Sequence, residues 1–319
     1  MATTVLGLKT FTASDPVDYN EVNDNYVKID SGVKTAFQGR AAHNWLDNSD
    51  FQINQRGSTS YTANGYTVDR WAISKWSNDS SVSINLSVNN NGVSLTGGVS
   101  SASTPSTCYI YQKIDCARLA GKTLTAAVYI GSLSGSGTGI IGSYNDSTYI
   151  KGATLKTGLN FITFDVPESA TIIMIRIGND ASIAGKGSIT ASIKWAALYE
   201  GSYTADTLPA YQPKGYGAEL AECQLYYRTM PYTVIPCGNN PPGTQVYGFL
   251  PFRMRIDKPT VSCDALYFFR GDTTFCPVLS ASAASYGSGT RIVFNISQSV
   301  EGNLAGVVAG NRITIDADL

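Results

Sequence analysis

The chain has 319 residues, more than one domain usually holds, so we expect two modest domains plus an extension. Only 15% of the residues are charged, while 31 are Gly and 19 are Tyr, a balance typical of β-rich proteins with neutral, polar surfaces. The 23 basic and 24 acidic side chains nearly cancel, and the sequence has no Lys/Arg cluster, which argues against electrostatic capture of nucleic acid or of an anionic membrane.

The sequence carries no signal for export or for a membrane span. Its start, MATTVLGLKTFTASDP, lacks a basic region followed by a long apolar stretch. No later segment approaches the roughly 20 apolar residues that a transmembrane helix needs. We therefore expect a soluble chain with no membrane insertion and no secretion signal of its own.

The cysteines show no CxxC spacing and no histidine partner at ligand spacing, which argues against zinc. They are Cys108, Cys116, Cys223, Cys237, Cys263 and Cys276. Because cysteine is among the most buried residue types, buried free thiols are the simplest interpretation, and pairing stays open.

A helix is predicted to start at Asp15 and Pro16, because Asp is a good N-cap and Pro suits the first helical position. An apolar stripe follows at alternating spacings of three and four: Tyr19, Val22, Tyr26, Ile29, Val33 and Ala36. The helix is too short and polar to be stable alone, and Gly32 weakens it by about 1 kcal/mol. The stripe therefore packs either on the chain's own β domain or against copies of itself in a short coiled coil.

Residues 44–211 are predicted to form a β-sandwich. Short apolar alternations such as YTVDRWAISKW, TLTAAVYIG and TIIMIRIG are separated by Gly, Asn and Ser. Eight or more strands at this spacing predict an antiparallel sandwich of the jelly-roll type. The fold class is thus mainly β.

The opening of this region, NWLDNSDFQINQRG, mixes aromatic, charged and amide side chains. No base, metal partner or basic surface accompanies them. We interpret the stretch as architecture, with Trp45 and Phe51 anchoring the first strand. Four polar residues are expected to satisfy turns: Asp47, Asn48, Asn54 and Arg56.

Residues 212–319 are predicted to form a linking helix and a second, smaller β-rich domain. Within GYGAELAECQLYYRTM, the spacing of one helical face is kept by Leu220, Cys223 and Tyr227. Glu219 and Glu222 fit the solvated face of that helix. Strand patterns such as TQVYGFLPFRMRI and RITIDADL continue to the end of the sequence.

The residues that catalysis needs are not grouped in the sequence. His43 is the single histidine and no Gly-x-Ser-x-Gly elbow accompanies it, so we interpret it as a junction residue making one hydrogen bond. Asp69 and Arg70 are expected to form an ion-paired, hydrogen-bonded turn before a buried Trp71. The segment SYNDSTY offers oxygen ligands without the acidic density of a calcium loop. We predict no catalytic residue, no metal and no cofactor.

A sandwich rich in Tyr, Trp and Asn is typical of sugar recognition. Aromatic faces stack on the apolar side of a pyranose, while amides and hydroxyls bond its OH groups. Trp76 ends its strand beside SNDSS, and Tyr144 and Tyr149 flank a predicted loop. These three residues are the predicted exposed glycan-binding candidates.

Several of these strings together resemble one family of proteins. NWLDNSDFQINQRG followed by GYTVDRW closely resembles the opening of a β-sandwich module of tail-fibre and receptor-binding proteins of tailed bacteriophages. WAALYEGSYTADTLPAYQPKGYGAELAECQLYYR is similar to the end of that module and the helix after it. LPFRMRIDKPTV resembles the start of the C-terminal β domain that often follows, and DYNEVNDNYVKID the short helices at the base of such fibres.

The resemblance implies a structural virion protein, assembled in the bacterial host cytoplasm, that forms a homotrimer. Residues 1–43 would attach to other virion proteins, and the β domains would bind a host cell-surface polysaccharide or protein without catalysis. Two alternatives stay open. One is a head fibre, collar or capsid decoration protein with a mainly architectural role, and the other is a polysaccharide depolymerase that uses an unrecognised carboxylate pair.

Overall fold

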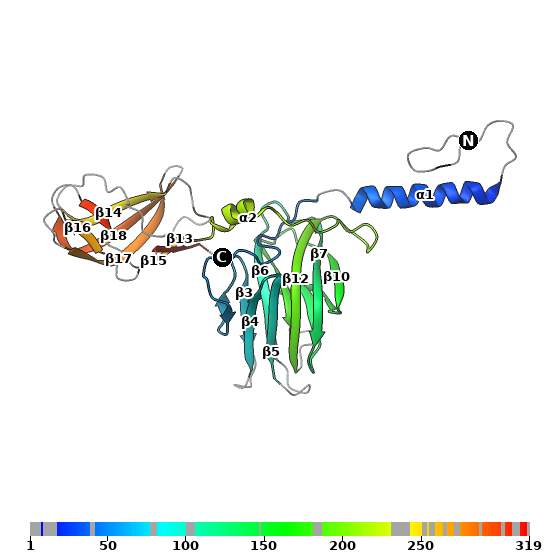
Figure 1. The fold of residues 1–319 in the computed structure, drawn as a ribbon, viewed down its shortest axis with the longest axis horizontal. Helices are drawn as coiled ribbons and strands as arrows, with labels where there is room; N and C mark the ends of the chain where they lie inside the picture. Colours follow the sequence, from blue (N-terminus) through cyan, green and yellow to red (C-terminus); the bar gives the residue numbers. More distant parts are fainter. Residues whose placement is uncertain are drawn as a thin grey trace.

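The computed structural model describes a chain that is mainly β, with two helices among the described residues (Figure 1). The described residues are 8, 18–38, 42–76, 82–99, 106–146, 148–180, 187–230, 243–250, 254, 259–263, 267–270, 275–286, 289–300, 304–307 and 313–317. Neither helix is both long and apolar enough to cross a membrane.

Two antiparallel sheets of six strands each form the central sandwich. The first sheet has the order β1 (Ser60–Tyr61), β4 (Ser83–Asn89), β5 (Gly92–Gly98), β12 (Ser188–Glu200), β7 (Thr123–Ser134), β10 (Gly158–Asp165). The second has the order β2 (Gly65–Tyr66), β3 (Ala72–Trp76), β6 (Thr107–Asp115), β11 (Ile172–Asn179), β8 (Ile140–Asn145), β9 (Thr148–Thr154). Non-consecutive neighbours within each sheet bring together residues that are far apart in the sequence.

One core lies between the two sheets. Along β7, Leu124, Ala126 and Val128 point into it, because side chains two apart in a strand share a face. Ile173 and Ile177 of β11 enter the same core from the second sheet. The predicted β-sandwich is therefore confirmed, whereas its jelly-roll type stays a prediction.

Helix α1 (Tyr19–Gln38) lies beside the sandwich rather than on it (Figure 1). Asp18 caps it, since its Oδ1 accepts a hydrogen bond from Asn20 N at 2.9 Å. Asp18 is thus the cap of the described helix, and the predicted start at Asp15 and Pro16 lies outside the described residues. On the predicted stripe Tyr19, Tyr26 and Ile29 are exposed, so this chain's own sandwich does not cover them.

Val22 on the same stripe is half-buried. Val33 and Ala36 fall within the helix, but their side chains lie outside the described residues. The coiled coil stays a prediction, as does the role of residues 1–43 in attachment; in this range residues 1–7, 9–17 and 39–41 lie outside the described residues.

The segment at residues 44–57 forms a buried turn, as its polar residues predicted. Asn48 is fully buried at φ 48°, and its Nδ2 donates to the carbonyls of Ile53 and Asp69, both at 2.8 Å. Its Oδ1 accepts from Ile53 N at 2.9 Å. Trp71 Nε1 donates to Asn48 O at 2.9 Å, which ties the turn to the core.

After the sandwich, α2 (Tyr216–Cys223) ends earlier than the predicted helical face requires, and Tyr227 opens strand β13 (Tyr227–Met230) instead. A three-stranded sheet has the order β13, β20 (Ile313–Asp316), β15 (Thr260–Cys263). A five-stranded sheet has the order β14 (Gly243–Leu250), β18 (Gly289–Val300), β17 (Phe275–Tyr286), β16 (Tyr267–Arg270), β19 (Leu304–Val307). This agrees with the predicted C-terminal β-rich region, while the domain limits stay predictions.

Three cysteines are free and buried: Cys108, Cys116 and Cys223. Burial raises the pKa of the Cys108 thiol to about 12 and that of Cys116 to about 11, so both stay protonated at neutral pH. The prediction of buried free thiols is confirmed for these three. The side chains of Cys237, Cys263 and Cys276 lie outside the described residues.

Candidate functional site

The three predicted glycan-binding residues differ in exposure. Trp76 and Tyr149 are 59% and 43% exposed, as a sugar-stacking ring must be. Tyr144 is only 1% exposed, so its predicted exposure is wrong. Its ring packs edge-on against Tyr149, with centroids 5.6 Å apart, and its hydroxyl donates to Asp180 Oδ2.

The structure brings Tyr144 and Tyr149 together but leaves Trp76 apart. Tyr144 of β8 lies opposite Tyr149 of β9. On its other side Tyr144 lies opposite Met174 of β11, which in turn lies opposite Lys113 of β6. Trp76 is on β3, opposite Thr107 of β6. With four strand steps of about 4.8 Å and six residues of about 3.3 Å each, Trp76 lies roughly 28 Å from Tyr149. The three predicted residues therefore do not form one site.

Around Tyr144, aromatic side chains gather on the outer face of the second sheet. We name the tyrosine cluster as Tyr109, Tyr111, Tyr144 and Tyr149 with Arg176 at its centre. The register places Arg176 of β11 opposite Tyr111 of β6, and Met174, two residues away on the same face, opposite Tyr144. Alternation along each strand thus puts all five on the face that points away from the core.

Arg176 is held in place from three sides. Its guanidinium carbon lies 3.7 Å from the ring centre of Tyr144 and 4.6 Å from that of Tyr109. Its Nη1 lies 3.1 Å from Asp180 Oδ2, and both side chains are largely buried. Burial raises the pKa of Tyr109, although the nearby Arg176 charge works against the rise. The cluster is thus a rigid, preorganised set of rings and hydrogen-bond donors.

Two glycines let the tyrosine rings lie against the sheet. A Cβ at Gly142 would lie 3.1 Å from Cε2 of Tyr144, and one at Gly152 would lie 3.3 Å from Cε2 of Tyr149. Each ring therefore covers the backbone of a glycine on its own strand. This leaves a shallow surface in which Tyr149 is the exposed ring.

A second aromatic surface lies on the outer face of the first sheet. We name it the aromatic platform: Tyr129, Trp195 and Tyr211. The rings of Trp195 and Tyr211 stack with centroids 4.5 Å apart and 3° between their planes, and Tyr129 lies 6.0 Å from Trp195. Sequence analysis missed this platform, because Tyr211 comes from the segment after β12 and no periodicity links it to β7.

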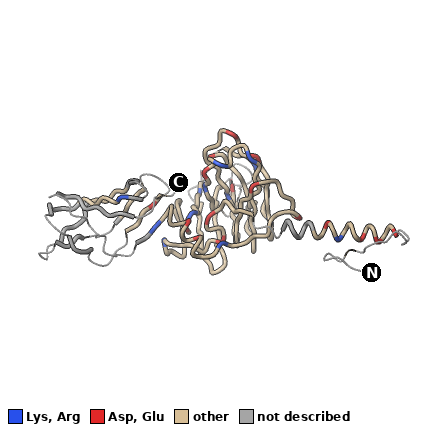
Figure 2. The backbone as a smooth tube through the Cα atoms, turned by 90° about the horizontal axis from the view of Figure 1, so that it is seen from above, with Lys and Arg blue, Asp and Glu red and all other residues tan. Residues whose placement is uncertain are grey.

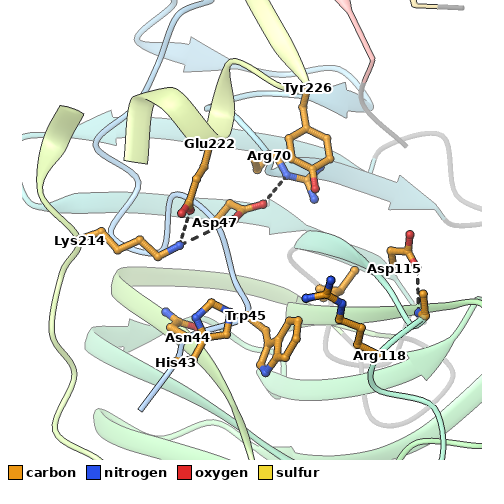
Figure 3. Close-up of a pocket in the computed structure, with 12 residues that line it drawn as sticks. His43, Asn44, Trp45, Asp47, Arg70, Asp115, Arg118, Lys214, Glu222 and Tyr226 are labelled. Atoms are coloured by element: carbon orange, nitrogen blue, oxygen red, sulfur yellow. Dashed lines mark hydrogen bonds and ion pairs between the residues drawn. The ribbon is translucent and has the colours of Figure 1, made fainter. Parts of the chain in front are cut away.

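A pocket of about 350 Å³ opens at the end of the sandwich near α2 (Figure 3). Its walls come from residues 43–47, from the connection after β6, and from Lys214, Glu222 and Tyr226 around α2. Arg70 pairs with Asp47 at 3.0 Å and lies 3.4 Å from the ring centre of Tyr226. Lys214 forms an ion pair with Glu222.

The predicted turn at Asp69, Arg70 and Trp71 is buried, as expected. Its ion pairs reach other segments, since Asp69 lies 3.6 Å from Arg56 and Arg70 pairs with Asp47. Asp69 Oδ1 accepts from Gln55 N at 3.1 Å. His43 is exposed and contacts Trp45 edge-on, with ring centroids 4.7 Å apart. Among the described residues it makes this ring contact in place of the predicted hydrogen bond.

Three carboxylates meet beside the pocket: Asp47, Glu219 and Glu222 have ligand oxygens within 4.8 Å of one another. The predicted solvated position of Glu219 is wrong, because α2 packs this residue against the turn, where it accepts a hydrogen bond from Asn48 N. Burial raises the pKa of Glu219. Lys214 Nζ bonds Glu222 and lies 3.9 Å from Asp47, so an ammonium already neutralises part of this group.

No protein-family model and no curated protein sequence matches the chain. Among solved structures, the enzymatically active domain of tailspike protein 4 of bacteriophage CBA120 is 13% identical, with a TM-score of 0.32 over 50% of this chain and 21% of that one. A CBM4 carbohydrate-binding module is 12% identical, with a TM-score of 0.35 over 49% of this chain and 99% of that one. TmCBM61, solved with β-1,4-galactotriose, is 12% identical, with a TM-score of 0.31 over 50% and 100%. These likenesses are distant, so function is argued from the residues of this chain.

Proposed function

We propose that the chain is a non-catalytic structural protein of a tailed-phage virion that binds a host-surface glycan through its sandwich. The observation that carries the proposal is the tyrosine cluster, in which an exposed Tyr149 adjoins an arginine held between two tyrosine rings. An exposed ring can stack on the apolar face of a pyranose, while the phenol hydroxyls of Tyr149 and of the half-buried Tyr111 bond its hydroxyls. Because these groups are already fixed, a sugar that binds them orders few side chains.

The charge distribution suits such a ligand. Over the described residues of the sandwich, Lys and Arg are interspersed with Asp and Glu (Figure 2). A neutral, mixed surface neither repels nor strongly attracts a charged polysaccharide at long range. Binding would then depend on short-range stacking and hydrogen bonds, which are weak for one site.

Trimers would make that weak binding effective. The exposed stripe of α1 leaves Tyr19, Tyr26 and Ile29 without cover in the single chain. Burying each such side chain against two other copies would contribute roughly 1.5–3 kcal/mol. Three linked sandwiches would then bind a repeating glycan with higher avidity than one.

The test of glycan binding compares two tyrosines of equal exposure. Tyr149 is 43% exposed and Tyr129 is 41% exposed, on opposite outer faces of the sandwich. On an array of host-surface glycans, Tyr149→Ala is expected to lower affinity about 5- to 30-fold, equivalent to about 1–2 kcal/mol of lost stacking and burial. Tyr129→Ala is the matched control and should leave affinity unchanged. Equal losses for both variants would contradict a site at the tyrosine cluster.

The test of assembly uses two apolar residues of α1. Ile29 lies on the stripe, whereas Val27 is exposed off it. Light scattering of the intact chain should give a trimer, which Ile29→Asp disrupts and Val27→Asp preserves. A monomeric wild-type chain, or equal effects of the two variants, would refute the coiled coil.

Location on the particle separates an adhesin from a head fibre, collar or decoration protein. Electron microscopy of labelled virions should place this chain at a tail tip if it binds the host.

A separate assay tests for catalysis, since a depolymerase would release reducing ends from host polysaccharide. We expect no release, because the clustered carboxylates Asp47 and Glu222 are bound to Arg70 and Lys214.

A further inference from the structure

The pocket at the end of the sandwich is separate from the tyrosine cluster and is lined by different side chains. Its volume of about 350 Å³ falls within the range of small-ligand sites, about 300–1,000 Å³. Because the two share no side chain, a ligand in this pocket would not compete directly with one at the tyrosine cluster.

The wall that contains Trp45 is fixed by the backbone of the sandwich. Trp45 N donates to Leu198 O at 2.9 Å, and the buried Asn44 Oδ1 accepts from Leu46 N and Leu198 N at 3.1 and 2.9 Å. Asp47 exchanges two hydrogen bonds with the side chain of Gln112, at 2.9 and 2.8 Å. The indole is thus held as a rigid, half-buried surface before any ligand arrives.

The ionic groups on the α2 side of the pocket are already paired. Arg70 binds Asp47 at 3.0 Å and donates to Lys113 O at 3.1 Å, while Lys214 binds Glu222. These pairs shape the wall and leave little net charge for a ligand. The charge that can act on a ligand must come from the other side.

That side has two charged residues, the acidic Asp115, whose Oδ1 accepts a hydrogen bond from Ala117 N at 2.8 Å, and Arg118. For an anionic ligand the attractive charge is that of Arg118. This residue is exposed on the connection after β6, lines the pocket, and extends toward Trp45 (Figure 3). Among the described residues it makes no hydrogen bond or ion pair. A free guanidinium presents a planar fork of donors that matches a carboxylate, and beside it Trp45 offers a surface for a ring.

We propose that this pocket binds a carboxylate-bearing sugar residue, with Arg118 on the carboxylate and Trp45 against the sugar ring. The inference rests on the proposed function for its ligand class, a saccharide. It adds a preference for acidic residues that the tyrosine cluster does not supply. Neutral sugar residues of the same polysaccharide would bind at the tyrosine cluster.

Intrinsic fluorescence can observe this pocket alone. The four tryptophans lie in separate places: Trp45 in the pocket, Trp71 in the core, Trp76 at the end of β3 and Trp195 on the platform. In the full chain carrying Trp76→Phe and Trp195→Phe, only Trp45 can respond to an added ligand, since Trp71 is fully buried. We would titrate this protein with digalacturonate and with its neutral dimethyl ester.

Digalacturonate is expected to change Trp45 emission and to bind at least tenfold more tightly than the ester. Arg118→Gln should weaken it about 10- to 100-fold, the usual value of a charge-assisted hydrogen bond. Lys122→Gln removes a charge from the same connection without touching the pocket and should change nothing. Emission of Trp71 in each variant confirms that the sandwich is folded.

Several results would overturn the proposal. They are equal binding of the acid and its ester, indifference to Arg118→Gln, no Trp45 response at all, or an equal response to acetate or inorganic phosphate, which would indicate an anion site only. Tyr149→Ala separates this proposal from the proposed function. If Tyr149→Ala abolishes array binding while Trp45 emission does not respond to digalacturonate, only the inference about the pocket fails. If Trp45 emission responds while Tyr149→Ala leaves array binding unchanged, the pocket inference holds and the glycan site at the tyrosine cluster fails.

Discussion

Asn48 offers the sharpest test of how the sandwich is held together. Asn48→Ala removes three side-chain hydrogen bonds, to Ile53 N, Ile53 O and Asp69 O. Ile53 O keeps a second donor, Asp69 N at 3.0 Å, so the groups left without these bonds are Ile53 N and Asp69 O. Both residues are buried, and each unsatisfied backbone group costs roughly 1–3 kcal/mol.

The backbone adds to that cost. Asn48 has a φ of 48°, in the left-handed region where Asn is better tolerated than Ala, which we take as about 1 kcal/mol. The sum predicts a loss of about 3–7 kcal/mol in the free energy of unfolding. Because domains are commonly stable by only about 5–15 kcal/mol, such a loss removes much of the stability of the sandwich.

Asn54→Ala is the matched control. Asn54 also makes three side-chain hydrogen bonds, to Ser58 O at 2.7 Å, Gly57 N at 3.2 Å and the Tyr61 hydroxyl at 2.6 Å. It is partly exposed, so water can replace these partners, and a loss of about 0.5–1 kcal/mol is expected.

Urea unfolding followed by tryptophan emission measures both variants. All four tryptophans belong to residues 45–195, so the signal reports the sandwich and not the C-terminal β region. The midpoint should fall much further for Asn48→Ala than for Asn54→Ala at an unchanged m-value. If the two free energies of unfolding differ by less than about 1 kcal/mol, the argument from buried hydrogen bonds is refuted.

Two further changes test local parts of the fold. Burial raises the pKa of Glu219 above its ordinary 4.5, so its contribution to stability is present below pH 4.5 and is lost as the pH rises through the raised pKa. In urea unfolding measured from pH 4 to 8, Glu219→Gln should flatten that decline in the free energy of unfolding. An unchanged slope against pH would contradict this prediction. Gly92→Ala would place a Cβ 2.1 Å from Ile193 O at a φ of 103°. Gly158→Ala is the control, because its φ is 94° but no atom lies near the added Cβ, so Gly92→Ala should lower the melting temperature much more. Similar shifts in melting temperature for the two variants would show that the close approach does not matter.

The sequence predicted those parts of the fold that depend on local pattern. Alternation in β7 and β11 identified strands with one buried face, and spacing identified α1. Tyr144 and Glu219 were misjudged because their burial depends on distant partners. Tyr144 is covered through Arg176 and Asp180, more than 30 residues away, and Glu219 is covered by Asn48, 171 residues away. A single sequence gives no sign of either pairing.

The candidate sites show the same limit more strongly. Trp76 and Tyr149 were found as exposed aromatic residues, but their separation follows from strand order, which no local pattern predicts. Arg176 lies inside an apolar strand pattern and was not predicted as a site residue. The platform joins β7 to β12 and the segment after it, and the pocket joins residues 43–47 to residues around α2. A polar or aromatic residue inside a strand pattern, such as Arg176, is the one signal that could have led to the tyrosine cluster.

The stretch NWLDNSDFQINQRG connects three parts of the molecule, which explains its unusual mixture of residues. At its start Trp45 is bonded to β12, and in its middle Asn48 is bonded to Glu219 of α2. At its end Arg56 lies 3.7 Å from the ring centre of Tyr227 in β13, and 3.4 Å from Asp316 in β20.

Charged and amide side chains suit such a connection, because each contact to a backbone group or carboxylate has a defined direction. Apolar contacts alone would allow the sandwich and the C-terminal sheets to slide. A segment bonded to the sandwich, to α2 and to β13 and β20 therefore fixes these parts against one another through hydrogen bonds and ion pairs rather than through a flexible linker.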